Sequence, residues 1–313
     1  MASKLRIGVI GVGAMGKNHA RIYAQFPNVE LIGVADANEN LATSVALSYG
    51  CKSYVEYRKL LDEKLDAVSV AVPTTLHKKI ALEAIDRGIN VLVEKPMSDT
   101  LENAEEMIRA AQKKKVKLMV GHTERFNPAI MKLKELISGG LLGNIVSMSA
   151  KRVGPYSPRI IDVGIIIDLG THDIDIMSYL YGARIKKVFA SAGNVLHSQE
   201  DHAIITLIFD NGSSGVIDTN WLTPHKVRNL TVIGSKGIAE LNYIEQTLRI
   251  FDKEWIRDAK IEKKEPLEIE LRHFVDCVLN NREPLVSGKE GEHALEVALA
   301  AVESARTGRV YEV

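Results

Sequence analysis

The sequence predicts an α/β protein in two parts, a doubly wound parallel sheet over residues 1–121 and an α+β domain over residues 122–313. The first observation is that short apolar runs alternate with amphipathic helical stretches up to Gly121, which is the pattern of βαβ units. The second is that strand-like runs follow one another closely after Gly121, which favours an open, largely antiparallel sheet backed by helices. The third is the length, since 313 residues exceed the usual size of one domain.

The strands expected in residues 1–121 are almost entirely apolar, as they are where helices cover both faces of a parallel sheet. They are Leu5–Ile10, Val29–Asp36, Ala67–Val72, Asn90–Val93 and Lys117–Val120. Apolar residues at helical spacing predict helices over Thr75–Arg87 and Thr100–Lys114. Each of these helices links two strands that we expect to run in the same direction.

The elements expected in residues 122–313 include a run of successive strands with few helices between them. The helices cover Pro128–Ser138, Ile167–Tyr181, Glu268–Asn280 and Lys289–Thr307. One strand ends at Arg152, a short one closes the chain, and the others cover Ile185–Ser191, His202–Phe209, Ser213–Asn220, Val227–Ile233, Gly237–Asn242 and Thr247–Phe251. A loop with Pro155 and Pro158 precedes the second helix, and Asp210-Asn211-Gly212 predicts a hairpin turn. These runs favour one antiparallel sheet.

The composition excludes several classes of partner. The chain has 40 basic and 40 acidic side chains with 46% hydrophobic residues, so no charge excess indicates nucleic acid or an anionic membrane. No apolar run approaches the roughly 18 residues of a membrane helix. Met1–Lys4 leads directly into a strand pattern without a secretory signal, so we expect a cytoplasmic protein with Cys51 and Cys277 as free thiols.

A glycine-rich segment after the first strand predicts a dinucleotide site. Gly11, Gly13 and Gly16 form a G-x-G-x-x-G pattern that includes Ala14 and Met15 and opens a helix. The first glycine permits a tight turn, the second lets the backbone approach a pyrophosphate, and the third allows close packing of helix and strand. The helix N-terminus adds free N–H groups and a positive dipole. An ordinary glycine-rich turn is the plainer alternative, but the strand–turn–helix context favours a Rossmann nucleotide site.

Asp36 stands twenty residues after Gly16, at the end of the second strand. A carboxylate there accepts hydrogen bonds from the ribose hydroxyls and repels a 2′-phosphate. Because Asn38 is neutral and no arginine follows, the pattern favours NAD, with NADP left open.

Polar residues also follow the later strands of this sheet. The carboxyl ends of parallel strands face the ligand crevice, so we expect Pro73, Thr74, His77, Glu94 and Lys95 to border the cofactor. Lys95 lies at an apolar strand end and precedes proline, an unusual place for a cation that needs only solvation. A surface lysine leaving the sheet is the alternative.

The helix near Ile167–Tyr181 carries a second group of polar residues. Asp168 and His172 are four residues apart and share one helical face, with Asp175 nearby. A helix-surface histidine and a carboxylate at a helix N-terminus are the plain alternatives. Asp173 and Asp175 add acidity that also raises the possibility of a metal site.

Two motifs together resemble a known family. Glu94-Lys95-Pro96 and Asp168-Leu169-Gly170-Thr171-His172-Asp173, at these distances from the glycine loop, are similar to those of the glucose–fructose oxidoreductase/inositol dehydrogenase (Gfo/Idh/MocA) family. The resemblance covers essentially the whole chain. It implies a Rossmann domain, a C-terminal α/β domain whose open sheet often mediates oligomers, and a cis peptide bond before Pro96. It also implies a homodimer or homotetramer.

The resemblance also implies a reaction. The family moves hydride between a sugar or polyol carbon and the nicotinamide, which needs a base for the hydroxyl proton. His172 can be neutral at working pH, and Lys95 could stabilise the developing alkoxide or act as base itself. Asp168 would orient the hydroxyl, and no metal is implied. Ile165 departs from the family, where many relatives have a second glycine after the one matching Gly164.

The substrate is the least determined feature. Gly121–Pro128 matches a segment that lines the family's cleft, which makes Arg125 a cofactor-binding and Asn127 a substrate-binding candidate, unless the segment is only a linker. Arg152 and Arg159 could hold a diphosphate or form a solvated edge. The pattern resembles the branch that oxidises the 3-hydroxyl of UDP-N-acetylglucosamine. An inositol or monosaccharide dehydrogenase is the next hypothesis, and a non-catalytic nucleotide-dependent sensor is an alternative of another class.

Overall fold

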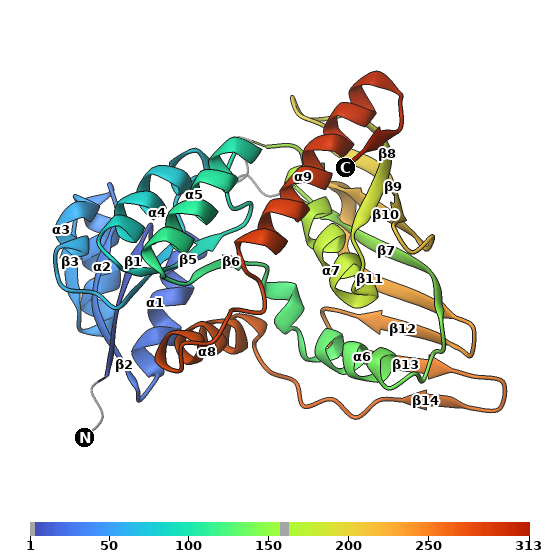
Figure 1. The fold of residues 1–313 in the computed structure, drawn as a ribbon, viewed down its shortest axis with the longest axis horizontal. Helices are drawn as coiled ribbons and strands as arrows, with labels where there is room; N and C mark the ends of the chain where they lie inside the picture. The colour runs from blue at the N-terminus through green and yellow to red at the C-terminus, as the bar shows by residue number, and fades with distance from the viewer. Residues whose placement is uncertain (1–3, 157–162) are drawn as a thin grey trace. The chain divides into compact units, whose positions relative to one another are not determined.

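The computed structural model describes residues 4–156 and 163–313. The chain divides into two compact units (Figure 1). The first unit contains Met1–His122 and Leu267–Glu292, and the second contains Thr123–Pro266 and His293–Val313. The domains expected from the sequence, 1–121 and 122–313, differ from these units because Leu267–Glu292 returns to the first one.

The first unit is built on a six-stranded parallel sheet in the order β3-β2-β1-β4-β5-β6. The strands are β1 (Leu5–Ile10), β2 (Val29–Ala35), β3 (Lys52–Tyr54), β4 (Ala67–Val70), β5 (Asn90–Glu94) and β6 (Leu118–Gly121). The doubly wound parallel sheet is therefore confirmed. The order reverses between β1 and β4, where doubly wound sheets bind their ligands. The sequence analysis missed β3 because this edge strand has only three residues and none of them is buried.

The helices of the first unit link these strands. They are α1 (Gly16–Gln25), α2 (Glu39–Tyr49), α3 (Tyr57–Leu61), α4 (His77–Asp86) and α5 (Leu101–Lys114). α4 begins two residues later than expected because Thr74–Leu76 forms a 3-10 turn. The Thr100 side chain caps α5 by accepting a hydrogen bond from Asn103 N, as serine and threonine do at helix starts.

A C-terminal segment completes the first unit. It includes α8 (Pro266–Leu279) and the first turn of α9 (Gly288–Thr307). β6 is an edge strand with unpaired backbone groups, and Val120 N donates to Val286 O at 3.0 Å. On α8, the Arg272 guanidinium lies 4.4 Å from the centre of the Phe26 ring. The segment returns to this unit because it satisfies an exposed strand edge.

The second unit contains a nine-stranded sheet in the described residues, in the order β14-β13-β12-β11-β7-β10-β9-β8-β15. The strands are β7 (Ile145–Pro155), β8 (Ile185–Gly193), β9 (His202–Phe209), β10 (Ser214–Asn220), β11 (Leu222–Gly234), β12 (Ile238–Asn242), β13 (Thr247–Phe251), β14 (Ile256–Asp258) and β15 (Tyr311–Glu312). β7 and β10 run parallel and the other pairs antiparallel, which confirms the largely antiparallel sheet. The hairpin at Asp210–Gly212 is confirmed as well, with Gly212 at φ +83°. Pro155 ends β7 instead of lying in a loop, and Pro158 is outside the described residues.

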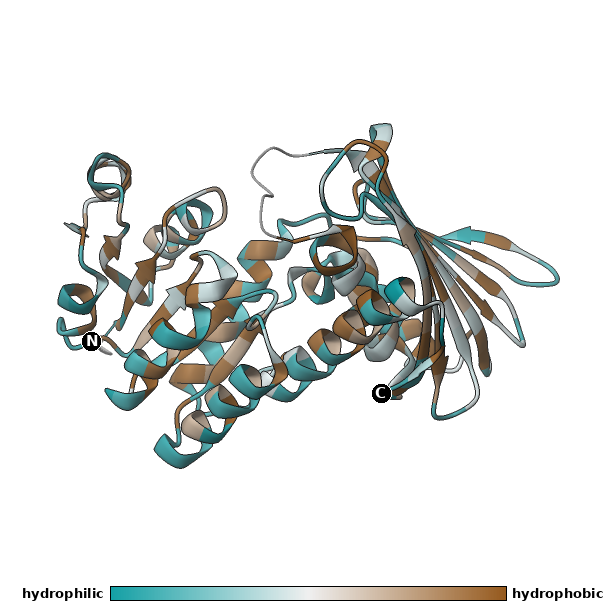
Figure 2. Ribbon diagram, turned by 90° about the horizontal axis from the view of Figure 1, so that it is seen from above, coloured by the Kyte–Doolittle hydropathy of each residue, from teal (hydrophilic) through white to brown (hydrophobic). Residues whose placement is uncertain are grey.

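Helices cover one face of this sheet, which Figure 2 shows nearly edge-on. α6 (Pro128–Ser138), α7 (Thr171–Tyr181) and the later turns of α9 contribute to the buried apolar core. The other face carries apolar side chains that are 39–47% exposed, namely Phe189, Ile204, Ile208, Val216 and Ile233. No helix of the described residues is long and apolar enough to cross a bilayer.

Candidate active site

The glycine loop of the first unit has a separate steric reason for each glycine. Gly11 has φ +81°, and a Cβ there would lie 2.6 Å from Ala71 O. A Cβ on Gly16 would lie 1.8 Å from Gly11 O, so α1 can pack against the loop only without a side chain. Gly13 is exposed and nothing lies within 4 Å of its Cβ position, so this side of the loop is open.

The loop therefore fits a pyrophosphate. No side chain caps the start of α1 at Met15, so its first N–H groups are not taken by a cap, and Ala14 is exposed beside Gly13. A ten-residue helix adds its dipole to those donors. A bound dinucleotide would be held here by the backbone of Gly13–Gly16.

Asp36 has contacts that the sequence analysis did not foresee. Its Oδ2 accepts from Val12 N at 2.9 Å and its Oδ1 accepts from Asn38 N at 2.9 Å. The carboxylate therefore ties the end of β2 to the glycine loop. Each oxygen keeps a second lone pair, so a ribose contact is compatible with this arrangement.

The loops after β4 and β5 bring together the other residues expected around the cofactor. Pro73 is exposed, while Thr74 and Lys95 are half-buried. The peptide bond between Lys95 and Pro96 is cis, as the family resemblance implied. These residues lie at the carboxyl edge of neighbouring parallel strands, where the crevice of such a sheet is found.

His77, which was expected to border the cofactor, is only 1% exposed in the structure. Nδ1 lies 2.9 Å from Pro96 O and Nε2 lies 2.9 Å from Val72 O. Burial lowers the pKa of His77, although both carbonyls and Glu94 act in the opposite direction. The ring links two loops rather than facing a ligand.

Glu94, which was also expected to border the cofactor, is buried as well. His19 Nε2 lies 3.0 Å from Glu94 Oε1, and Lys95 N donates to Glu94 Oε2 at 3.3 Å. Burial raises the pKa of Glu94, but the hydrogen bond and charge of His19, with the charge of Lys95, hold it below its usual range. The carboxylate therefore belongs to the framework under Lys95.

Asp168 and His172 lie on consecutive turns of the second unit and are both half-buried. Asp168 lies in a π-helical turn, Ile166–Gly170, that leads directly into α7. The structure therefore differs from the expected α-helix over its first turn, because Ile166–Gly170 is π-helical and the α-helix begins at Thr171. Such wide turns occur often at functional sites. Thr171 Oγ1 donates to Ile167 O at 2.7 Å and holds the junction between the two helical forms.

Arg152 is the centre of a buried ion-pair cluster, not a substrate contact. Its Nε donates to Asp173 Oδ2 at 2.7 Å, and a terminal nitrogen donates to Glu124 Oε1 at 2.7 Å. The guanidinium lies 4.7 Å from the centre of the Tyr243 ring, and Tyr243 OH donates to Asp173 Oδ1 at 3.4 Å. Arg152 is 1% exposed, and the guanidinium that was expected to hold a diphosphate is engaged by these two carboxylates. Burial lowers the pKa of Arg152, but Asp173 and Glu124 raise it well above the usual value.

Arg125 and Asn127 have similar structural roles. Arg125 Nε donates to Asp175 Oδ2 at 2.9 Å and its NH2 donates to Oδ1 at 2.6 Å, with both side chains buried. Asn127 caps α6 through Ala129 N, and its amide donates to Tyr243 O at 3.1 Å. Both residues were expected to touch ligands, and both are instead engaged within their own unit. Arg159 lies outside the described residues.

The carboxylates of α7 therefore have arginine partners. Asp173 pairs with Arg152 and Asp175 pairs with Arg125. Among residues 4–156 and 163–313, no group of three or more His, Cys, Asp or Glu side chains is arranged to hold a metal ion.

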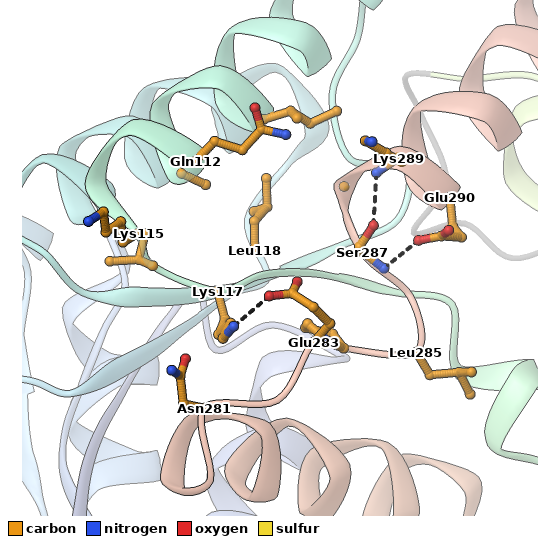
Figure 3. A pocket seen from close by; sticks show the side chains of 15 residues that line it. Gln112, Lys115, Lys117, Leu118, Asn281, Glu283, Leu285, Ser287, Lys289 and Glu290 are labelled. Carbon is orange, nitrogen blue, oxygen red and sulfur yellow. Dashed lines mark hydrogen bonds and ion pairs between the residues drawn. The ribbon is translucent and has the colours of Figure 1, made fainter.

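A cavity of about 710 Å³ lies in the first unit, away from the predicted site residues (Figure 3). It is bounded by the end of α5, the start of β6 and the start of α9. Lys117 donates to Glu283 at its wall, and Ser287 N donates to Glu290 Oε2. None of the residues expected from the sequence to act in catalysis or binding lines it.

Three residues of these frameworks were missed by the sequence analysis, namely His19, Glu124 and Tyr243. Each acts through a partner far away in the chain, and the contact of Tyr243 with Asp173 spans 70 positions. Glu124 lies in the segment Gly121–Pro128 that the sequence analysis considered, but only Arg125 and Asn127 were named there.

Comparison with known proteins supports the two-part organisation. Residues 5–122 match the model described as the oxidoreductase family with an NAD-binding Rossmann fold. Residues 130–240 match the GFO/IDH/MocA C-terminal domain. Together these matches cover more than half of the chain.

Individual relatives align over nearly their whole length. UDP-N-acetylglucosamine 3-dehydrogenase of Acidithiobacillus ferrooxidans is 30% identical over 94% of this chain and 95% of its own. Its solved structure has a TM-score of 0.91 and covers 96% of this chain and 97% of that one. scyllo-Inositol 2-dehydrogenase (NAD(+)) of Bacillus subtilis is 30% identical over 98% of this chain and 96% of its own.

Proposed function

This chain belongs to the Gfo/Idh/MocA family of NAD-binding oxidoreductases, and we propose from this premise that it oxidises a secondary hydroxyl of a nucleotide sugar. It is an oxidoreductase of the sugar and polyol dehydrogenase class, with a nicotinamide dinucleotide as cofactor. The proposed reaction is oxidation of the 3-hydroxyl of UDP-N-acetylglucosamine with NAD.

The observation that carries a catalytic role is the division of polar residues on one helical segment. Asp173 and Asp175 are buried and engaged by arginines, which hold α7 against its sheet. Asp168, on the preceding π-helical turn, and His172, on α7 itself, remain half-buried. Buried paired charges maintain the segment, so the more accessible pair is the part of it that serves chemistry.

The proposed roles follow from the chemistry of the side chains. When bound, the nicotinamide accepts the hydride that leaves the carbinol carbon. The hydroxyl proton goes to one of Lys95 and His172, because a neutral imidazole or a neutral amine is the base that this step needs. The other donates a hydrogen bond to the same oxygen, and Asp168 orients the hydroxyl. The hydroxyl becomes a carbonyl, with one hydride and one proton removed.

The support for a nucleotide sugar is the full-length likeness to UDP-N-acetylglucosamine 3-dehydrogenase. Arg152 no longer supports it, because the guanidinium is engaged by Asp173 and Glu124. An inositol is the second candidate, since inositol dehydrogenases of Bacillus subtilis and Thermotoga maritima are also 30% identical over nearly the whole chain.

One substrate panel tests the proposal. The purified protein is mixed with NAD and either UDP-N-acetylglucosamine, UDP-glucose, myo-inositol or glucose, and NADH is followed by absorbance. We expect NADH with UDP-N-acetylglucosamine first. NADH from myo-inositol alone would transfer the assignment to the polyol class. No turnover with any of the four, in a protein that binds NADH, would favour a nucleotide-dependent sensor.

Two variants test the catalytic residues in the same assay. Lys95→Ala and His172→Ala should each reduce kcat by about 10²–10⁴-fold, the range for a lost acid–base group, with NADH binding retained. Normal turnover in both variants would overturn the assignment. The pH dependence of kcat in each variant then identifies which residue takes the proton.

The outer face of the second unit's sheet supports a homo-oligomer. Phe189, Ile204, Ile208, Val216 and Ile233 lie on one face and are exposed in the single chain. Exposed apolar side chains gathered on one sheet face favour an interaction surface, and a second copy of this chain is the proposed occupant. Ile204→Lys with Val216→Lys should lower the mass found by light scattering to that of a monomer.

A further inference from the structure

We propose that two buried histidines, His19 and His77, position Lys95 by holding the backbone on both sides of it. The proposal concerns residues that touch neither substrate nor cofactor. It rests on the proposed function, because it takes Lys95 to act at the substrate hydroxyl. The argument uses contacts within the first unit alone.

The first contact chain reaches Lys95 from α1. His19 is fully buried, and its Nε2 lies 3.0 Å from Glu94 Oε1. The other oxygen of the same carboxylate accepts from Lys95 N at 3.3 Å. The side chain of His19 therefore holds the carboxylate that binds the amide group of Lys95.

Glu94 has little freedom to leave this position. A Cβ on Gly121 of β6 would lie 3.1 Å from Glu94 Cδ, so the backbone of β6 closes one side of the carboxylate. The hydrogen bond from His19 closes another. A carboxylate confined in this way transmits the position of His19 to Lys95 N.

The second contact reaches the turn from α4. His77 Nδ1 lies 2.9 Å from Pro96 O, the carbonyl one residue beyond Lys95. Nε2 lies 2.9 Å from Val72 O, in the loop after β4. Both partners are hydrogen-bond acceptors, so a neutral ring donates to one of them and an imidazolium donates to both. In either state the ring ties the turn to the neighbouring loop.

Several charged and titratable groups of the first unit lie around these rings, and Glu270 of α8 acts on the neighbouring Tyr23. His77 faces Glu94, and Glu94 faces His19, His77 and Lys95. Tyr23 lies next to His19 with ring centres 6.4 Å apart, and its hydroxyl pairs with Ser69 Oγ at 2.8 Å. Burial raises the pKa of Tyr23, so the phenol remains neutral beside them.

These contacts predict an effect on turnover rather than on binding. The side chain of Lys95 starts from a backbone that is fixed at the preceding carboxylate and at the following carbonyl. If either support is removed, the amine moves relative to the reacting carbon, and a displacement of about 1 Å reduces turnover by about 100-fold. The imidazole rings of both histidines bond to Glu94, Pro96 and Val72 and not to the glycine loop, so replacing the rings should leave nucleotide affinity unchanged.

The test replaces each histidine with a ring of similar size that cannot form hydrogen bonds. His19→Phe and His77→Phe are compared with the unchanged protein, using NAD and UDP-N-acetylglucosamine, or myo-inositol if only that substrate gives turnover. We expect kcat to fall about 10–100-fold in each, while KM and the NADH Kd change by less than about threefold. The pH at which kcat is half-maximal should shift by about one unit, because Lys95 changes its surroundings.

His273→Phe is the matched control. His273 is a half-buried histidine of the same unit whose Nε2 accepts from Leu285 N at 2.9 Å, in the loop between α8 and α9. Its replacement should reduce the melting temperature to a similar degree without moving the pH profile. His77→Gln, whose amide can donate to a carbonyl, should recover about tenfold of the lost kcat. If the phenylalanine variants do not fold, His19→Asn and His77→Asn are measured by the same criteria.

The outcomes separate this inference from the proposed function. Wild-type kcat and pH profile in both histidine variants, with Lys95→Ala inactive, would overturn the positioning role and leave the function intact. Normal turnover in Lys95→Ala would overturn the function itself. A loss of NADH affinity in proportion to kcat would show that the histidines act through the cofactor, which also contradicts the proposal.

Discussion

The glycine loop of the first unit and the Asp168/His172 segment of the second hold their functional groups in opposite ways. The loop is shaped by the absence of side chains, since a Cβ on Gly11 or Gly16 would meet backbone atoms at 2.6 and 1.8 Å. The helical segment is held by buried charge, through arginine pairs at Asp173 and Asp175. The loop therefore depends on the close approach of backbone atoms, and the helix depends on ion pairs between side chains. This difference predicts different responses to mutation.

The largest expected effect lies at the buried cluster of the second unit. Arg152→Met leaves Asp173 buried without its cation, so the free energy of unfolding should fall by about 3–5 kcal/mol in urea titrations. Arg152→Met combined with Asp173→Leu should recover most of that loss, because it removes both charges. Arg228→Met is the control. The ion pair of Arg228 with Glu124 is long, at 3.8 Å, and the arginine side chain is partly exposed, so its loss should cost little stability. A stable Arg152→Met variant with a raised substrate KM would contradict the view that Arg152 acts on stability through Asp173.

The next effect separates binding from stability at the glycine loop. Gly13→Ala places a methyl group where nothing lies within 4 Å, so the free energy of unfolding should change by less than about 0.5 kcal/mol. The methyl group would occupy the approach of the pyrophosphate, so the NADH Kd should rise at least tenfold, about 1.4 kcal/mol. Gly16→Ala should instead lower the melting temperature. Fluorescence titration measures the NADH Kd, and thermal unfolding measures the melting temperature. The same changes in Kd and melting temperature in Gly13→Ala and Gly16→Ala would contradict the steric account.

A smaller effect extends the comparison to a loop held by a carboxylate. Asp201 is fully buried and accepts from the backbone N–H groups of Val195, Leu196 and His197 and from the His202 ring. Burial raises the pKa of Asp201, but these donors lower it from 3.8 to about 2.

This carboxylate therefore contributes stability above about pH 4, and the contribution disappears as the pH falls through about 2. Between pH 6 and pH 2, the free energy of unfolding from urea titrations should fall by about 1–2 kcal/mol more in the unchanged protein than in Asp201→Asn, which lacks this ionisable group. An identical pH dependence in the two proteins would be evidence against this role of Asp201.

The smallest effect concerns the choice between NAD and NADP. Asp36→Asn removes the charge but keeps an oxygen that can accept from Val12 N, so the preference for NAD should narrow by about tenfold. Asp36→Ala also removes the hydrogen bond to the glycine loop, so it should weaken the binding of both NADH and NADPH. The preference is measured as the ratio of the dissociation constants for NADPH and NADH. An unchanged ratio in Asp36→Asn would argue against a ribose contact.

Sequence analysis was most successful where a local pattern determines the conformation. The expected helix Pro128–Ser138 and the strands His202–Phe209 and Thr247–Phe251 match the structure at both ends. It could not foresee the ion pairs of charged residues next to a motif. Arg125 was expected to bind the cofactor because its segment resembles one that lines the family's cleft, and Arg152 was expected to bind a diphosphate because arginine suits phosphate groups. Their carboxylate partners in the structure are 50 and 21 positions away.

The sequence by itself determined the parallel nucleotide-binding sheet, the glycine loop, and the spacing of Asp168 and His172. Steric restrictions and hydrophobic periodicity act between near neighbours, so they are visible in the order of residues. Only the tertiary structure decided that Leu267–Glu292 completes the first unit, that Arg152 and Arg125 support α7, and that His19 and His77 lie behind Lys95. Those roles depend on which buried charges and carbonyls find partners, and folding brings such partners together from distant positions.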